Sequence, residues 1–122
     1  MKELLKNNLE TIQNRLWEIN DILYHHPELG DQEYDSMNLL VELLEQHQFS
    51  VEKGIVGRPT AFKAVYDSKK EGPTIAYLSE YDALPEVGHG CGHNMIGTMS
   101  AGAGVLLSKV VDEIGGRVVV LG

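Results

Sequence analysis

The stretch Thr74-Ile75-Ala76-Tyr77-Leu78-Ser79 is apolar nearly throughout, without the polar and apolar alternation of a half-buried strand. Such a run is typical of a strand covered on both faces. Helical spacing of apolar residues follows from Asn94 to about Glu113, and Val118 to Leu121 then predicts another fully buried strand. A strand, a helix and a strand in this order predict a right-handed parallel crossover, which is typical of an α/β fold.

The predicted helix carries two kinds of residue on different faces. Apolar side chains recur at helical spacing, and the two methionines among them are expected to be core residues: Met95, Met99, Ala103, Leu106 and Val110. Small residues form a second face, on which the backbone can lie close against a sheet: Gly97, Ser100, Ala101 and Gly104. The pair Gly115-Gly116 is expected to end the helix.

Two further helices and a hairpin are predicted before this unit. One apolar stripe predicts a long first helix, stopped by Pro27: Leu5, Leu9, Ile12, Leu16, Ile19 and Leu23. A second helix, with Asp31 as its expected N-cap, has one apolar face: Tyr34, Met37, Val41 and Leu44. Period-two segments at 49–52 and 61–66 then predict an edge strand and its hairpin partner. We therefore expect a mixed sheet with flanking helices in one domain.

Composition excludes several classes of function. The 122 residues include 18 Asp and Glu against 10 Lys and Arg, a net charge of -8, so binding to nucleic acid or an anionic membrane is not expected. The single Cys91 excludes an internal disulfide, and no apolar run approaches the ~20 residues of a membrane span. The charged N-terminal sequence MKELLKNNLE does not fit a signal peptide. These features predict a cytoplasmic setting.

The loop from Glu80 to His93 is the expected functional site, because open α/β sheets bind ligands beyond the carboxyl ends of their strands. It combines three acids, two histidines and the only cysteine of the chain. Thiolate, imidazole and carboxylate are ligands of zinc and related divalent ions. Cys91 and His93 can reach one centre if Gly92 turns the backbone sharply.

Other residues of the loop are further candidates, each with a structural alternative. Glu80 and Asp82, two residues apart, would share one side of an extended segment, although each also fits a turn or a strand end. His89 fits either a functional role or a hydrogen bond within the turn. Cys91 alone would fit a small buried residue, or a nucleophile with a histidine as its base.

Three segments resemble, in order and spacing, the amidohydrolase branch of the aminoacylase and carboxypeptidase metallopeptidases, which includes hippurate, auxin-conjugate and p-aminobenzoyl-glutamate hydrolases. They are Glu28-Leu29-Gly30 after Pro27, Glu80 to Pro85 (EYDALP), and Gly88 to Asn94 (GHGCGHN). The resemblance implies that Cys91 and His93 are metal ligands and that Asp82 is a catalytic residue, an acid that supports the site without binding the ion itself. Glu80 stands where many members carry Asp and where the wider superfamily carries a ligating histidine.

The resemblance also implies an activity: hydrolysis of N-acyl or N-aroyl amino acids or small dipeptides with one or two Zn or Mn ions. Members continue into a glutamate pair, further histidine ligands and a lid or dimerisation domain, which this sequence does not contain. We therefore expect residues 1–122 to be the N-terminal portion of one catalytic domain, inactive alone and prone to self-association through uncovered strands. The alternative is a non-catalytic metal-binding or interaction remnant of the same fold.

Overall fold

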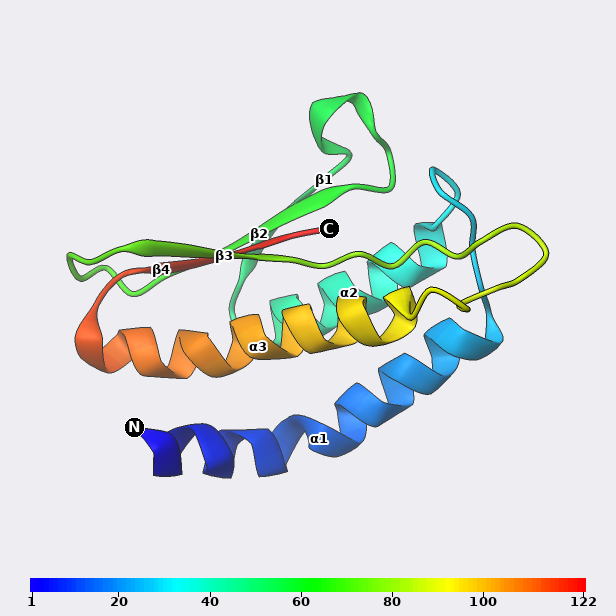
Figure 1. The fold of residues 1–122 in the computed structure, drawn as a ribbon. Helices are drawn as coiled ribbons and strands as arrows, with labels where there is room; N and C mark the ends of the chain where they lie inside the picture. The colour runs from blue at the N-terminus through cyan, green and yellow to red at the C-terminus, as the bar shows by residue number, and fades with distance from the viewer.

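The computed structural model describes all residues from Met1 to Gly122, folded as three long helices and one four-stranded sheet (Figure 1). The elements in chain order are α1 (Lys2–His25), α2 (Tyr34–Gln46), β1 (Ser50–Lys53), the short helix η1 (Ile55–Gly57), β2 (Phe62–Asp67), β3 (Thr74–Leu78), α3 (His93–Ile114) and β4 (Arg117–Leu121). No helix is long and apolar enough to cross a membrane.

The sheet is mixed, in the order β1-β2-β4-β3. β2 pairs antiparallel with β1 and β4, while β3 pairs parallel with β4 through α3. The predicted α/β fold, the parallel strand–helix–strand unit and the edge position of β1 are therefore confirmed.

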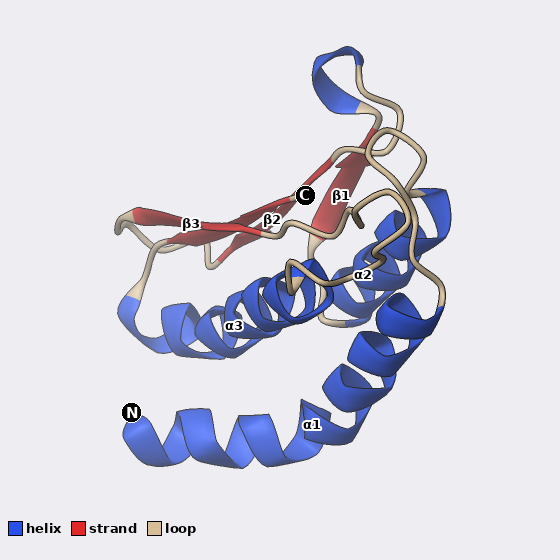
Figure 2. Ribbon diagram, turned by 45° about the vertical axis from the view of Figure 1, so that its right-hand side comes forward, coloured by secondary structure: helices blue, strands red, loops and turns tan.

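All three long helices lie on one side of the sheet, and no long helix covers the other (Figures 1 and 2). The expectation that β3 is covered on both faces is wrong: it is an edge strand, and its Leu78 is 63% exposed. The central strand β4 is buried on its helix-facing side, at Val118 and Val120, and only partly buried on the other. The apolar run without alternation at residues 74–79 therefore did not show whether other elements cover both faces of β3.

The small residues of α3 face the sheet as predicted. A Cβ added at Gly104 would lie 2.5 Å from the Val120 side chain, so the backbone of α3 lies directly against β4. On another side of α3, a Cβ at Gly102 would meet Leu16 of α1 at 2.9 Å. The helix α3 is thus held between the sheet and α1. These two contacts fix the position of the N-terminus of α3.

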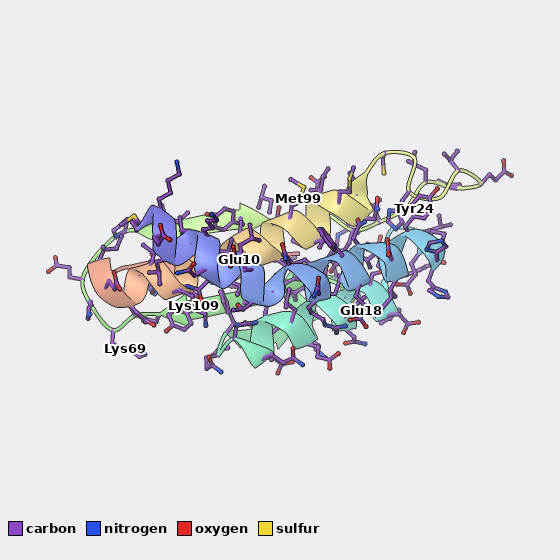
Figure 3. All side chains as sticks on the ribbon, turned by 90° about the horizontal axis from the view of Figure 1, so that it is seen from below. Glu10, Glu18, Tyr24, Lys69, Met99 and Lys109 are labelled. Atoms are coloured by element: carbon purple, nitrogen blue, oxygen red, sulfur yellow. The ribbon has the colours of Figure 1, made fainter.

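The methionines of α3 are not core residues, contrary to the prediction. Met95 and Met99 are 54% and 67% exposed, and Met99 lies at the outer margin of α3 in Figure 3. Because the small-residue faces are the ones that pack, these large side chains are turned toward solvent. In α1 the predicted stripe is buried at Ile12, Ile19 and Leu23, whereas Leu9 is 41% exposed.

The start of α2 also differs from the prediction. Asp31 is not the N-cap; that position is Glu33, whose side chain does not cap the helix. Glu28 accepts hydrogen bonds from the backbone N–H groups of Asp35 and Ser36 instead, at 3.2 and 2.7 Å. A carboxylate at this end is favourable because it satisfies free N–H groups and complements the helix dipole.

Candidate metal centre

The candidate site residues lie in the segment that connects the carboxyl end of β3 to the start of α3, as the sequence predicted (Figure 1). Its beginning is fixed by buried contacts. The Ser79 hydroxyl donates to the Gly97 carbonyl oxygen at 2.9 Å, and a Cβ at Gly97 would lie 2.8 Å from the Glu80 carbonyl oxygen. The absence of a side chain at Gly97 therefore lets α3 lie against the segment that carries the two acids.

Tyr81 determines which way the neighbouring acids point. Its ring is 3% exposed and stacks on Phe62 at 6.1 Å between ring centroids, and its hydroxyl donates to the Thr60 carbonyl. Burial, with the nearby Glu33 and Glu28, raises the pKa of this phenol. Because successive residues of an extended segment point to opposite sides, burying Tyr81 leaves Glu80 and Asp82 on the opposite side.

Both acids contact one histidine. Asp82 Oδ1 lies 2.6 Å from His93 Nδ1, and Glu80 Oε2 lies 3.0 Å from His93 Nε2. The His93 side chain is 24% exposed, against 56% for Glu80 and 42% for Asp82. The two acids therefore lie on the same side of the segment, as their spacing predicted, and the His93 ring lies between them.

The Glu28-Leu29-Gly30 segment lies beside the segment that carries Asp82. The Ala83 N–H donates to the Glu28 carbonyl at 2.7 Å, and Leu29 and Ala83 form an isolated parallel bridge. A Cβ at Gly30 would lie 3.7 Å from Asp82 Oδ2. Two motifs more than fifty residues apart in sequence thus form one wall of the site.

Cys91 is exposed and precedes the first residue of α3 by two positions. Gly92, at φ 86°, forms the sharp turn that the sequence predicted. The Cys91 thiol lies 3.9 Å from the Asp82 carbonyl oxygen. Neither histidine of the loop contacts the thiol, and both ring nitrogens of His93 already face carboxylates, so the cysteine-nucleophile alternative lacks its base.

His89 is the most deeply buried polar side chain of the loop, at 5% exposure. Neither of its ring nitrogens makes a hydrogen bond of normal distance and angle, although the Leu23 backbone lies close enough to act on the ring. Burial and the neighbouring His93 lower the pKa of His89, partly opposed by Asp82 and the Leu23 backbone, so the neutral ring is favoured. A buried polar atom without a partner is costly, and these nitrogens therefore fit a missing group such as an ion or ordered water.

No three His, Cys, Asp or Glu side chains are arranged to hold an ion in this structure. His93 is brought together with Glu80 and Asp82, while Cys91 approaches only the backbone of Asp82. The donor types nevertheless fit a divalent ion: a thiolate, two imidazoles and two carboxylates occur within fourteen residues.

A pocket of about 380 Å³ lies at the carboxyl ends of β3 and β4, and Glu80 and Asp82 line it, whereas His89 and His93 do not. Arg58 and Asp31 form an ion pair across its rim at 2.6 Å. The Thr60 hydroxyl donates to Glu33 at 3.0 Å inside it. Sequence reasoning missed these residues; the only signal was a single arginine in the turn at Gly57 and Pro59.

Comparison with known proteins was made for sequence and structure. No protein-family model matches the chain. The chain is 33% identical over 124 residues to a p-aminobenzoyl-glutamate hydrolase component of Escherichia coli, covering 88% of this chain and 25% of that protein. It is also 33% identical over 130 residues to thermostable carboxypeptidase 2 of Saccharolobus solfataricus, covering 95% of this chain and 33% of that protein.

A solved structure of similar fold is that of a dinuclear metal-binding peptidase of the M20 family from Bacillus subtilis. The TM-score is 0.79 at 26% sequence identity, and the match covers 92% of this chain and 35% of that chain. This chain thus spans between a quarter and about a third of the length of the proteins it matches.

Proposed function

Because the homologues and structural neighbours of this chain are amidohydrolases and peptidases of the M20 family, we propose that its loop site serves metal-dependent amide hydrolysis. The substrates would be N-acyl or N-aroyl amino acids or small dipeptides. Residues 1–122 would correspond to the N-terminal portion of the catalytic domain, because the match covers most of this chain and only a part of each relative.

The observation that carries the proposal is the contact between Asp82 and His93. A carboxylate on one ring nitrogen fixes the orientation and tautomer of a ligating histidine and increases its basicity. With Asp82 Oδ1 2.6 Å from Nδ1, the nitrogen left to bind an ion is Nε2, which now faces Glu80.

Cys91 and His93 would hold the ion, and Glu80 and His89 are further candidates. Glu80 already lies at the ligating nitrogen of His93, and His89 has two buried nitrogens without partners. A divalent ion in such a site supplies a Lewis acid for the amide carbonyl and lowers the pKa of a bound water. Zinc suits the thiolate best, while manganese suits the carboxylates.

We further expect residues 1–122 to be inactive by themselves. A catalytic zinc takes about three protein ligands. The chain offers no three His, Cys, Asp or Glu side chains arranged to hold an ion. We therefore expect weak metal binding without hydrolysis. The same observation favours a second candidate function, a metal-binding module without catalysis.

The first test is binding of the hydroxamate of N-benzoylglycine, a probe that binds metal ions in amidohydrolase sites. Zinc-loaded chain should bind it, while metal-free chain and a Cys91→Ser variant with added zinc should not. The matched control is Ser100→Ala, a partly buried position of α3 away from the loop. Equal hydroxamate binding with and without zinc would contradict the proposal.

A hydrolysis assay tests the expected inactivity of residues 1–122. N-benzoylglycine, p-aminobenzoyl-glutamate and a dipeptide are incubated with the chain and Zn²⁺, Mn²⁺ or Co²⁺. We expect no turnover. Metal-dependent turnover that Cys91→Ser abolishes would overturn the expected inactivity of residues 1–122 and the non-catalytic alternative, while supporting the amidohydrolase assignment.

A further inference from the structure

We propose that Arg58 recognises the carboxylate of the substrate, in the pocket that Glu80 and Asp82 also line. This inference rests on the proposed function, because the N-acyl amino acids and dipeptides named above all carry a free carboxylate. It adds a specificity-determining residue that lies outside the metal-binding loop.

The charge of the pocket supports this role. Asp31, Glu33, Glu80 and Asp82 all line it, and Arg58 is the only lysine or arginine among its lining residues. Four carboxylates repel an anionic ligand, so a substrate carboxylate can be accommodated only next to the one cation. Guanidinium groups bind carboxylates through paired hydrogen bonds, which also fix orientation.

The guanidinium has donors to spare. Its only contacts are from Nη1 to the two carboxylate oxygens of Asp31, at 2.6 and 2.7 Å. Nε and Nη2 have no protein partner, and an arginine carries five N–H donors in all. The Arg58 and Asp31 side chains are 63% and 58% exposed, so their pair contributes little to stability. Arg58 can therefore bind a second carboxylate or exchange Asp31 for it.

Arg58 lies in the loop between β1 and β2, residues 54–61. A hydrogen bond to the backbone of this loop connects it to the segment that carries Glu80 and Asp82. Ala61 N–H donates to the Arg58 carbonyl at 3.1 Å, and the Thr60 carbonyl accepts a hydrogen bond from the hydroxyl of Tyr81, the residue between Glu80 and Asp82. Two further backbone hydrogen bonds close the loop, from Gly54 N–H to the Ala61 carbonyl at 2.7 Å and from Arg58 N–H to the Ile55 carbonyl at 2.9 Å. Arg58 is thus held at a defined position relative to the acids and is not on an unattached surface loop.

The experiment measures binding of two probes to the metal-free chain by NMR titration: N-benzoylglycine and the neutral N-benzoylglycinamide. The carboxylate should bind about tenfold more tightly than the amide, and Arg58→Gln should remove that difference. The matched control is Arg117→Gln, an exposed arginine at the opposite end of β4 that contacts Thr74 Oγ1. It should bind both probes as the unchanged chain does.

Asp31→Asn distinguishes recognition from a purely structural ion pair. Removing the competing carboxylate should strengthen binding of N-benzoylglycine by about threefold, the opposite direction from Arg58→Gln. If the Arg58–Asp31 ion pair served only to stabilise the structure, both Arg58→Gln and Asp31→Asn would weaken binding of N-benzoylglycine. Equal affinity for the two probes, or an unchanged preference in Arg58→Gln, would overturn the proposal. Because no metal is present, these results do not depend on whether Cys91 and His93 hold an ion.

Discussion

The two ends of the parallel pair β3 and β4 are built in opposite ways. At the amino end, backbone lies against backbone: a Cβ at Gly115 would be 2.2 Å from the Glu71 carbonyl oxygen, and one at Gly116 would be 2.5 Å from that of Pro73. At the carboxyl end, partly exposed side chains meet through polar atoms, as in the contact of Asp82 with His93.

This difference separates folding from function. The amino end has no room for a side chain at the passage from α3 to β4, so it determines where the helix ends and the last strand begins. The carboxyl end instead surrounds a pocket with partly exposed charged groups. Substitutions at the amino end should therefore change stability, and substitutions at the carboxyl end should change binding.

The largest expected effect is on folding, from Gly115→Ala. The new Cβ would meet the Glu71 carbonyl in a residue at φ 90°, so clash and strain together should cost about 3 kcal/mol or more. Urea unfolding followed by circular dichroism measures this. Gly57→Ala is the control, because Gly57 has φ 73° but nothing within 4 Å, and should cost only about 1 kcal/mol. If Gly115→Ala and Gly57→Ala lower the free energy of unfolding equally, close backbone packing at the amino end makes no special contribution to stability.

The next effect is at the carboxyl end, from His93→Ala. Loss of a ligand should weaken zinc binding by about 100-fold, while the urea midpoint changes little because the side chain is partly exposed. Competition with a chelating dye measures the affinity. His25→Ala, at the exposed C-terminal end of α1, is the matched control. If His93→Ala and His25→Ala both bind zinc as tightly as the unchanged chain does, His93 is excluded as a ligand.

A smaller loss is expected from Asp82→Asn. The amide keeps the shape of the side chain but removes the charge that orients His93, so zinc affinity should fall about tenfold. Asp21→Asn, on the exposed side of α1, serves as the control. If zinc binding is insensitive to Asp82→Asn, the contact with His93 has no supporting role.

The smallest effect concerns pH at the amino end. The Tyr66 hydroxyl donates to Asp112 at 2.6 Å, and this bond, with burial and the charge of Asp112, raises the pKa of Tyr66 to about 12. The resulting stability is fully present below the ordinary tyrosine pKa of about 10 and is lost as pH rises through about 12. Asp112→Asn should lower the pKa of Tyr66, which the ring carbon NMR signals report. Metal binding should not change.

The sequence predicted the features that depend on local pattern. Helical spacing and the glycines of α3 indicated the parallel crossover. The rule that open α/β sheets bind ligands beyond the carboxyl ends of their strands led to the candidate site after β3, and its function stays a prediction. The spacing of Glu80 and Asp82 correctly predicted that they share one side, because an extended backbone alternates its side chains.

What the sequence did not predict depends on tertiary packing. Met95 and Met99 have helical spacing, but only the sheet and α1 decide which side of α3 is covered. Asp31 fits an N-cap by residue type, yet it pairs with Arg58, 27 residues away. Arg58 itself has no local signal, because the role proposed for it depends on acids of other segments that meet in the pocket.

The central claim is that Cys91 and His93 hold the same ion at the carboxyl end of β3, and a cobalt titration tests it most directly. Co²⁺ added to the reduced chain should give a saturable thiolate-to-cobalt absorption band. Cys91→Ser should abolish the band, and His93→Ala should weaken the binding that produces it. Cobalt binding without a thiolate band, or a band that His93→Ala leaves at full affinity, would contradict the claim.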